Sequence, residues 1–229
     1  MQIRVFIADE HTLLREGLRA LLAQHSEVTV VGDAPDGKTT LSEAVRLRPD
    51  IVLMNITLPG MNGMEVTAHL KRRLPTMRVI MLTSVKSEEY LRESLRVGAD
   101  GYLLKDASHE ELVLALRNVT QGRKYLSPAV SGQLVDGFLN PIHGNLNQSP
   151  LHRLTSRERS VLQLIAEGRT NRSAAEFLSV SPKTIEKHRA RLMQKLGLRN
   201  ASELLMVAVE MGMIERPGTL SRLIDRSYA

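Results

Sequence analysis

The sequence predicts an α/β domain with a five-stranded, doubly wound parallel sheet, followed by an all-α domain of four helices. Short apolar runs alternate with amphipathic stretches through the first 125 residues, and only helical patterns follow residue 150. The length of 229 residues also fits two domains of about 100 to 200 residues each.

Five short apolar runs are the expected strands. They are mostly uninterrupted and rich in branched residues, which is typical of parallel strands covered on both faces. The runs are 3–8, 28–31, 51–54, 79–82 and 101–104. Between them, apolar residues such as Leu14, Leu18 and Leu22 recur on one helical face. Ser108 and Glu111 form a capping box that opens the last helix of this domain, and Gly122 is expected to end it.

The segment after the sheet is the expected linker. A helix is predicted over 128–139, because Pro128 suits a first helical turn. Residues 140–150 have no periodicity and no charge and are rich in Asn, Gly, Pro and Ser. We therefore divide the chain into an α/β domain at 1–125, a linker at 126–150, a helical domain at 151–216 and a tail at 217–229.

The helical domain carries a start signal for each main helix. Thr155 and Glu158 form a capping box, Ser181 precedes a first-turn proline, and Asn200 precedes Glu203 by three residues. These signals open the first, third and fourth helices, and a short second helix is expected over 171–178. Short, closely joined helices with basic residues on the third are typical of a helix-turn-helix.

Charge and composition restrict the function. The chain carries a net charge of +6, has no Cys and is 42% hydrophobic. Residues 1–125 hold 17 Lys and Arg against 16 Asp and Glu, whereas residues 151–216 hold 12 against 7. A basic module behind a near-neutral one favours a regulatory domain joined to a nucleic-acid-binding domain. Without Cys there are no disulfides or thiol nucleophiles, and without an apolar signal or spanning segment we expect a cytoplasmic protein.

Polar residues end four of the predicted strands. Asp9 and Glu10 follow the first, Asn55 the third, Thr83 the fourth and Lys105 the fifth. Ligands of such sheets bind at this carboxyl edge, and two adjacent carboxylates favour a divalent cation such as Mg²⁺. Each residue alone is equally explained as a solvated turn or an ordinary strand end, so the prediction depends on their convergence.

The motifs around these residues resemble a known family. ADEHTLLREGL, DIVLMNITLPGMNG, VIMLTS and GYLLKD resemble the flavodoxin-like receiver domain of two-component response regulators. LTSRERSVLQLIAEGRTN and SPKTIEKHRARLMQKLGL resemble the LuxR-type helix-turn-helix of the NarL/FixJ subfamily. The resemblance covers most of the chain, in the expected domain order.

The resemblance assigns a role to each pocket residue. It implies that Asp9 and Glu10 hold Mg²⁺, that Thr83 contacts a phosphoryl oxygen, and that Lys105 pairs with the phosphoryl charge. Fixed cations of this kind offset the negative charge of a phosphoryl group during transfer. Tyr102 stands where the family has an aromatic that packs inward when Thr83 moves, although passive packing explains it as well.

The phosphoacceptor position departs from the family. Asn55 stands where the family carries the phosphorylated Asp, and a neutral amide is a far weaker nucleophile than a carboxylate. We therefore expect no aspartyl phosphorylation and weaker Mg²⁺ binding. Two explanations remain open: a receiver that works without phosphorylation, or an engineered Asp-to-Asn version.

The third helix of the helical domain is the expected DNA reader. The resemblance places Glu186, Lys187 and Ala190 at base edges, and Lys183, Thr184 and Arg191 at phosphates, with Arg189 on the same basic helix. Glu186 either accepts a hydrogen bond from cytosine or pairs with Arg189. In relatives the unphosphorylated receiver covers this helix, and the fourth helix forms a dimer contact.

Three functions compete. The favoured one is a DNA-binding response regulator in a phosphorelay. Its expected partners are double-stranded DNA, a homodimer partner and, in a form with Asp restored at position 55, a sensor histidine kinase. A nucleotide- or flavin-binding enzyme is disfavoured, because the turn after the first strand lacks phosphate-binding glycines. The alternative is a receiver-based protein-interaction module that does not bind DNA.

Overall fold

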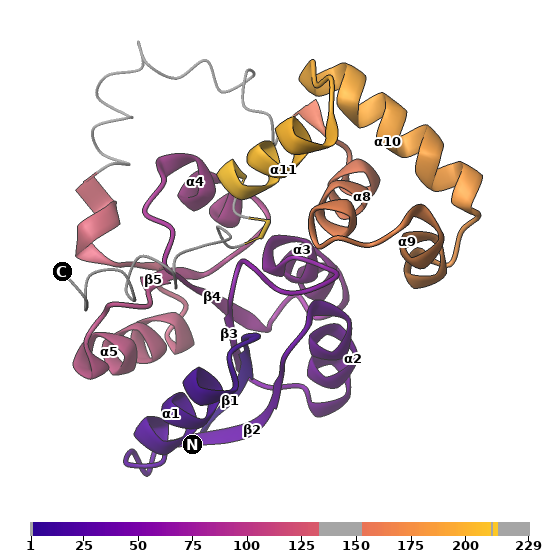
Figure 1. Cartoon of the computed structure of the whole chain (residues 1–229). Helices are drawn as coiled ribbons and strands as arrows, with labels where there is room; N and C mark the ends of the chain where they lie inside the picture. The colour runs from indigo at the N-terminus through magenta and orange to yellow at the C-terminus, as the bar shows by residue number, and fades with distance from the viewer. Residues whose placement is uncertain (1, 133–152, 212, 215–229) are drawn as a thin grey trace, which may run out of the picture.

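A parallel sheet forms the centre of the N-terminal domain in the computed structural model, which describes residues 2–132, 153–211 and 213–214. The strand order is β2-β1-β3-β4-β5-β6, and every neighbouring pair is parallel (Figure 1). The strands are β1 (Ile3–Ala8), β2 (Val28–Ala34), β3 (Ile51–Met54), β4 (Arg78–Thr83), β5 (Gly101–Leu104) and β6 (Tyr125–Leu126). The doubly wound sheet is thus confirmed, and β6 adds a two-residue strand that the apolar pattern does not predict.

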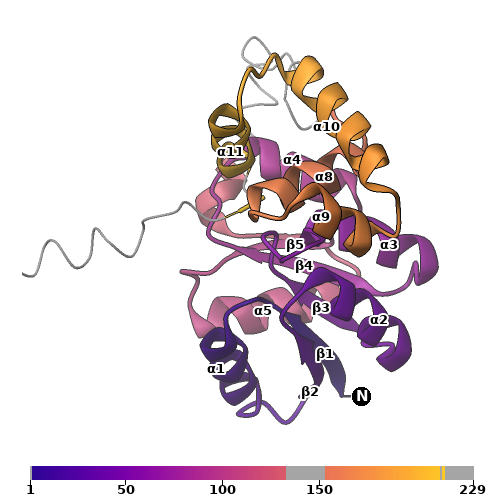
Figure 2. The same cartoon turned by 45° about the vertical axis from the view of Figure 1, so that its right-hand side comes forward.

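Helices cover both faces of this sheet. Helices α1 (Thr12–Leu22) and α5 (His109–Thr120) cover one face, and α2 (Gly37–Leu47), α3 (Gly63–Arg73) and α4 (Glu88–Arg96) cover the other (Figure 2). Along β3, Leu53 packs toward α1 and α5, while Val52 and Met54 pack toward the opposite layer, and all three are fully buried. Burial on both faces explains why this strand is an apolar run without alternation.

The C-terminal domain consists of helices α8 (Ser156–Ala166), α9 (Asn171–Leu178), α10 (Pro182–Leu196) and α11 (Ala201–Glu210). The predicted caps are present: the side chains of Thr155, Ser181 and Asn200 each accept a hydrogen bond from a backbone N–H three residues on. The Thr155 capping box is complete, because the Glu158 carboxylate also accepts the Thr155 N–H at 2.8 Å. These caps satisfy backbone donors that would otherwise have no partner inside the helix.

The linker is only partly described. Residues 128–132 are helical, so the predicted helix begins at Pro128. The rest of 128–139, the coil at 140–150 and the tail at 217–229 lie outside the described residues. Among the described helices, none is both long and apolar enough to cross a membrane.

The C-terminal domain packs on the N-terminal domain beside the loop that follows β3. Leu58 of that loop and Leu164 of α8 belong to the same buried hydrophobic cluster. Helix α8 lies next to α3, and α10 lies on the side of its domain away from the sheet (Figures 1 and 2). The two domains therefore share an interface that leaves α10 at the periphery.

Candidate functional site

The predicted pocket residues gather at the carboxyl edge of the sheet. Asp9 follows β1, Asn55 follows β3 and Lys105 follows β5, and these strands lie on either side of the sheet's centre. Asp9 and Asn55 are almost completely buried, with exposed fractions of 1% and 3%. The parallel register places the ends of the strands side by side, which is why residues from three strands converge.

Asp9 is held between two basic groups. Lys105 Nζ lies 2.7 Å from Asp9 Oδ2, and His11 Nδ1 lies 2.9 Å from Asp9 Oδ1. The backbone N–H of His11 also donates to Asp9 Oδ1 at 2.9 Å. A buried carboxylate needs such partners, because leaving its charge unpaired costs several kcal/mol. Lys105 therefore neutralises Asp9 in this structure.

Asn55 uses its amide as a donor. Its Nδ2 donates to Glu10 Oε2 at 3.1 Å and to the Thr57 carbonyl at 3.0 Å. A carboxylate at this position would have no hydrogen to donate, and it would repel Glu10. The amide thus links β1 to the loop after β3 through two contacts that an aspartate does not form without a cation between the oxygens.

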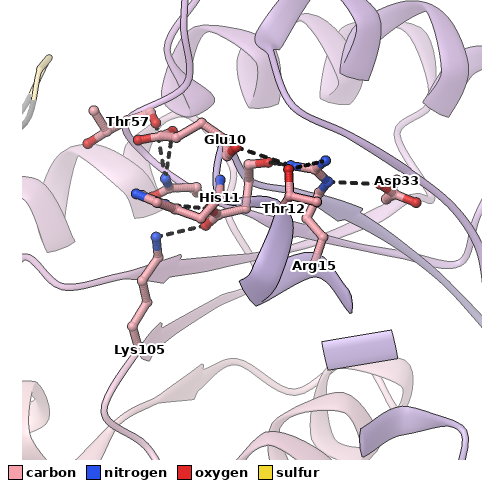
Figure 3. Close-up of polar contacts among 9 residues, drawn as sticks. Glu10, His11, Thr12, Arg15, Asp33, Thr57 and Lys105 are labelled. Atoms are coloured by element: carbon pink, nitrogen blue, oxygen red, sulfur yellow. Dashed lines mark hydrogen bonds and ion pairs between the residues drawn. The ribbon is translucent and has the colours of Figure 1, made fainter. Parts of the chain in front are cut away.

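Arg15 of α1 braces the turn that carries the acidic pair (Figure 3). Its Nη1 donates to the backbone carbonyls of Asp9 and Glu10 at 2.8 and 3.2 Å, and its Nε donates to Asp33 Oδ2 at 2.8 Å. Burial alone would raise the pKa of Asp33, but hydrogen bonds from Arg15 and Arg19 lower it below its ordinary value. Neither Arg15 nor His11 was predicted from the sequence, since neither lies at the end of an expected strand.

Thr83 and Tyr102 lie together on the neighbouring strands β4 and β5. Both are buried, and the Tyr102 hydroxyl donates to the Val85 carbonyl at 2.7 Å, while the Thr83 hydroxyl accepts the Val85 N–H at 3.1 Å. Burial raises the pKa of Tyr102 well above its ordinary value, against a smaller lowering by a hydrogen bond with Thr83. Tyr102 is thus packed inward and tied to the loop after β4.

The acidic end of the pocket offers a donor set for a cation. One ligand atom from each of Asp9, Glu10 and His11 lies within 4.8 Å of the others. Carboxylate oxygens are the ligands that Mg²⁺ prefers, whereas an imidazole nitrogen suits transition metals better. Lys105 and the Asn55 amide already contact two of these carboxylates, so a cation must compete with them.

The candidate reading helix is amphipathic. Ile185 and Leu192 are fully buried and fix α10 to its domain. The predicted DNA contacts are exposed at Lys183, Glu186, Lys187, Ala190 and Arg191, and partly exposed at Thr184 and Arg189. In the described residues Glu186 forms no ion pair with Arg189, so the pairing explanation for Glu186 is not supported. The covering of this helix by the receiver, which the resemblance implies, is also not seen in the described part of the chain, since these side chains remain accessible.

The loop after β3 connects the pocket to the C-terminal domain. Gln163 Nε2 of α8 donates to the Leu58 carbonyl at 2.6 Å, and the Gly60 N–H donates to Glu167 Oε1 at 2.8 Å. Thr57, whose carbonyl accepts from Asn55, immediately precedes Leu58. A cavity of about 200 Å³ lies between the two domains here, lined by Glu10, Thr57, Leu58, Pro59, Glu167, Met213 and Ile214.

Charged contacts extend the interface along α3 and α4. The Ser160 hydroxyl donates to both carboxylate oxygens of Glu65 at 3.0 and 3.1 Å, and Arg159 Nη1 lies 3.1 Å from Glu93 Oε1. Burial alone would raise the pKa of Glu93, but hydrogen bonds from Arg96 and Arg159 lower it below its usual value. For Glu65 burial dominates and raises the pKa of the carboxyl.

Comparison with known proteins assigns both domains to families. Residues 5–117 match the response regulator receiver domain, and residues 152–208 match the bacterial regulatory proteins of the luxR family. The transcriptional regulatory protein DegU of Brevibacillus brevis is 33% identical over 93% of this chain and 96% of its own length. The oxygen regulatory protein NreC of Staphylococcus carnosus is 35% identical over 93% of this chain and 100% of its own. The structure of RcsB from Salmonella enterica serovar Typhimurium bound to a promoter is also similar, with 26% identity and a TM-score of 0.61. The match covers 90% of this chain and 98% of the RcsB chain.

Proposed function

The chain belongs to the response regulators that join a receiver domain to a LuxR-type helix-turn-helix domain, and we propose that its receiver controls DNA binding without aspartyl phosphorylation. It is a DNA-binding regulator of transcription and not an enzyme. The proposal covers the chemistry at Asn55, the residues that contact DNA, Mg²⁺ binding, and the homodimer and kinase partners. It also includes the division of the chain into domains and linkers at residues 1–125, 126–150, 151–216 and 217–229. A cytoplasmic location is part of the proposal too, because bacterial DNA lies in the cytoplasm.

The hydrogen bonding of Asn55 carries the proposal. Its amide donates to Glu10 and to the Thr57 carbonyl, so the group at the acceptor position acts as a donor and not as a nucleophile. Acyl phosphate formation there would require prior loss of ammonia. Lys105, the expected partner of a phosphoryl charge, instead lies against Asp9. The acidic pair therefore engages both the Asn55 amide and the Lys105 ammonium.

Mg²⁺ binding at Asp9 and Glu10 is a weak interaction in this proposal. Oxygen ligands from two adjacent carboxylates suit the ion, but Asn55 supplies a neutral oxygen where a third carboxylate would otherwise stand. A cation must also compete with Lys105 for Asp9. When bound, the ion would supply positive charge beside Asn55.

Helix α10 is the proposed DNA-reading element. In this proposal Glu186, Lys187 and Ala190 contact base edges, Lys183, Thr184 and Arg191 contact phosphates, and Arg189 belongs to the same DNA-binding helix. Their accessibility supports this assignment, together with the burial of Ile185 and Leu192 on the opposite face. A homodimer through α11 is part of the proposal, because Leu205 and Met206 on that helix are exposed. A sensor histidine kinase would be a partner only of the Asn55→Asp form.

The test restores a carboxylate at the acceptor position. We expect Asn55→Asp to acquire beryllofluoride-dependent changes in dimerisation and DNA binding, measured by sedimentation and fluorescence anisotropy, since Thr83, Lys105 and Tyr102 are in place. The Asn55 protein is expected to give the same curves with and without beryllofluoride. A hydroxylamine-sensitive phosphoryl label on Asn55 after incubation with acetyl phosphate would contradict the proposal.

A second experiment separates DNA binding from the interaction-module alternative. Replacing Lys187 and Arg191 by Ala removes two cations from the exposed face of α10. If α10 contacts DNA, affinity falls, and the slope of log K against log salt becomes shallower by about one for each phosphate that is no longer neutralised. Unchanged affinity and slope would favour the alternative. Arg172→Ala on α9 is the matched control, because this exposed arginine lies outside the assigned set.

A further inference from the structure

Two histidines outside the pocket face one another across the α1–α5 layer. His25 lies in the loop after α1, and His109 is the first residue of α5. Their Nε2 atoms are 2.7 Å apart, and the ring centroids are 4.8 Å apart at an interplanar angle of 45°. Both side chains are half-buried. The two histidines are 84 positions apart in the chain, and their Nε2 atoms point toward one another.

This contact involves two potential ligand atoms. In the metal-free state one neutral imidazole donates its Nε2–H to the Nε2 lone pair of the other. Among the described residues neither ring has another hydrogen-bond partner. A metal ion can take both Nε2 atoms once the shared proton moves to Nδ1 of its own ring, which leaves both imidazoles neutral.

The spacing is close to that of two ligands on one metal ion. With metal–nitrogen distances of about 2.0 to 2.1 Å and tetrahedral angles, two nitrogens lie about 3.3 Å apart. The Nε2 atoms need to separate by only about 0.6 Å from their present distance, which small side-chain rotations provide. Square-planar geometry, with cis nitrogens about 2.9 Å apart, needs still less movement.

The charges near the two rings are mixed: the carboxylates of Glu27 and Glu110 favour a cation, whereas the positive N-terminal end of α5, at His109, opposes one. Glu27 lies two residues after His25, and Glu110 follows His109 directly. The basic group that contacts Glu27 is Arg117, and the ion pair between them, at 2.6 Å, offsets its charge. The acidic cluster at Asp9 is a separate site at the carboxyl edge of the sheet.

We propose that His25 and His109 form a two-histidine site for a divalent transition metal of the Zn²⁺, Ni²⁺ and Cu²⁺ class, with water completing the coordination. Imidazole nitrogen is a preferred ligand for these ions and a poor one for Mg²⁺. Binding would join the loop after α1 to the start of α5. The site is independent of the function proposed above.

Zinc titration of the full chain by calorimetry, with excess Mg²⁺ present, tests the site. We expect one equivalent of Zn²⁺ to bind, and His25→Gln or His109→Gln to weaken that binding at least tenfold. His69→Gln is the matched control, because this histidine of α3 contacts Arg72 and has no imidazole partner among the described residues. Glu10→Gln controls for zinc binding at the acidic pocket, and it should leave the affinity of the one expected Zn²⁺ ion unchanged.

Two further readouts keep the test independent of folding defects. The ¹⁵N resonances of the two Nε2 atoms should shift on zinc addition in the unaltered chain, and binding should weaken in acidic solution, because protons compete with the metal for the imidazole nitrogens. Equal zinc affinity in His25→Gln and the unaltered chain would overturn the proposal. So would unshifted Nε2 resonances at millimolar zinc.

Discussion

Gly60 controls how closely the two domains approach. It has φ +76°, and a Cβ built on it would lie 2.5 Å from Cζ of Phe177 and 3.1 Å from the two Cε atoms. Carbon atoms in favourable contact are about 3.5 to 4.0 Å apart, so the α9 ring must move by about 1 Å or the domains must separate. We expect Gly60→Ala to favour the separated state.

The size of the effect follows from the cost of overpacking. Inserting a methyl group into a packed interface costs about 1 to 3 kcal/mol, which lowers the docking equilibrium constant about 5- to 150-fold. Moving the Phe177 ring also disturbs its contact with the Arg169 guanidinium, 4.8 Å from the ring centroid. The left-handed backbone adds a separate cost of about 1 kcal/mol, which is equal in the docked and separated states.

Hydrogen exchange at the Gly60 N–H measures docking directly, because this group donates to Glu167 of the other domain. Its protection should fall in Gly60→Ala by about the factor given above. Gly122→Ala is the matched control: it has φ +81°, and its nearest non-neighbouring atom is 3.6 Å away, so it carries the backbone cost without the clash.

The second substitution Phe177→Ala isolates the clash. It removes the ring, so adding Gly60→Ala in that background should change docking by less than about 0.5 kcal/mol. If Gly60→Ala reduced protection equally with and without the Phe177 ring, or if Gly122→Ala reduced it as much, steric contact with α9 would not be the cause. Unchanged protection in Gly60→Ala would refute the docked arrangement itself.

Three other substitutions test the domain interface, the contact between Tyr102 and the loop after β4, and the first helix of the C-terminal domain. Burial in the docked state raises the pKa of Glu65, so docking should strengthen as pH falls from neutrality through that raised pKa, and Glu65→Gln should remove this dependence of hydrogen-exchange protection. Tyr102→Phe removes the hydroxyl that donates to the Val85 carbonyl and should lower the free energy of unfolding by about 1 kcal/mol in urea titrations. Thr155→Ala removes the α8 cap and should cost about 1 kcal/mol in the same assay, whereas an unchanged midpoint would contradict the role of the capping box.

Local signals predicted the elements well because the forces that set them act over a few residues. The caps at Ser108, Thr155 and Asn200 each join a side chain to a backbone N–H three positions on, so spacing alone identifies them. Strand β6 escaped prediction, since two residues carry no periodicity. It forms through pairing with β5, which is a tertiary contact.

The pocket was predictable to the extent that its residues end strands. Asp9, Asn55 and Lys105 follow from the topology, because parallel strands place their carboxyl ends together. The roles of His11 and Arg15 could not be predicted, because they depend on side-chain directions after the first strand. The domain interface could not be predicted from the sequence either, because Gln163 and Leu58 are 105 residues apart. The local sign was a glutamine within an apolar stretch, and the structure shows that it is buried.

The geometry of one loop connects the acceptor position with domain docking. Three backbone groups of this loop are divided between the two sites: the Thr57 carbonyl accepts from Asn55, the Leu58 carbonyl accepts from Gln163, and the Gly60 N–H donates to Glu167. An aspartate at position 55 has no hydrogen to give to Thr57, so its replacement of the amide changes the loop on the pocket side. Because the same short segment supplies the contacts to α8, a change in the group at position 55 reaches the DNA-binding domain through the backbone and requires no intermediate helix.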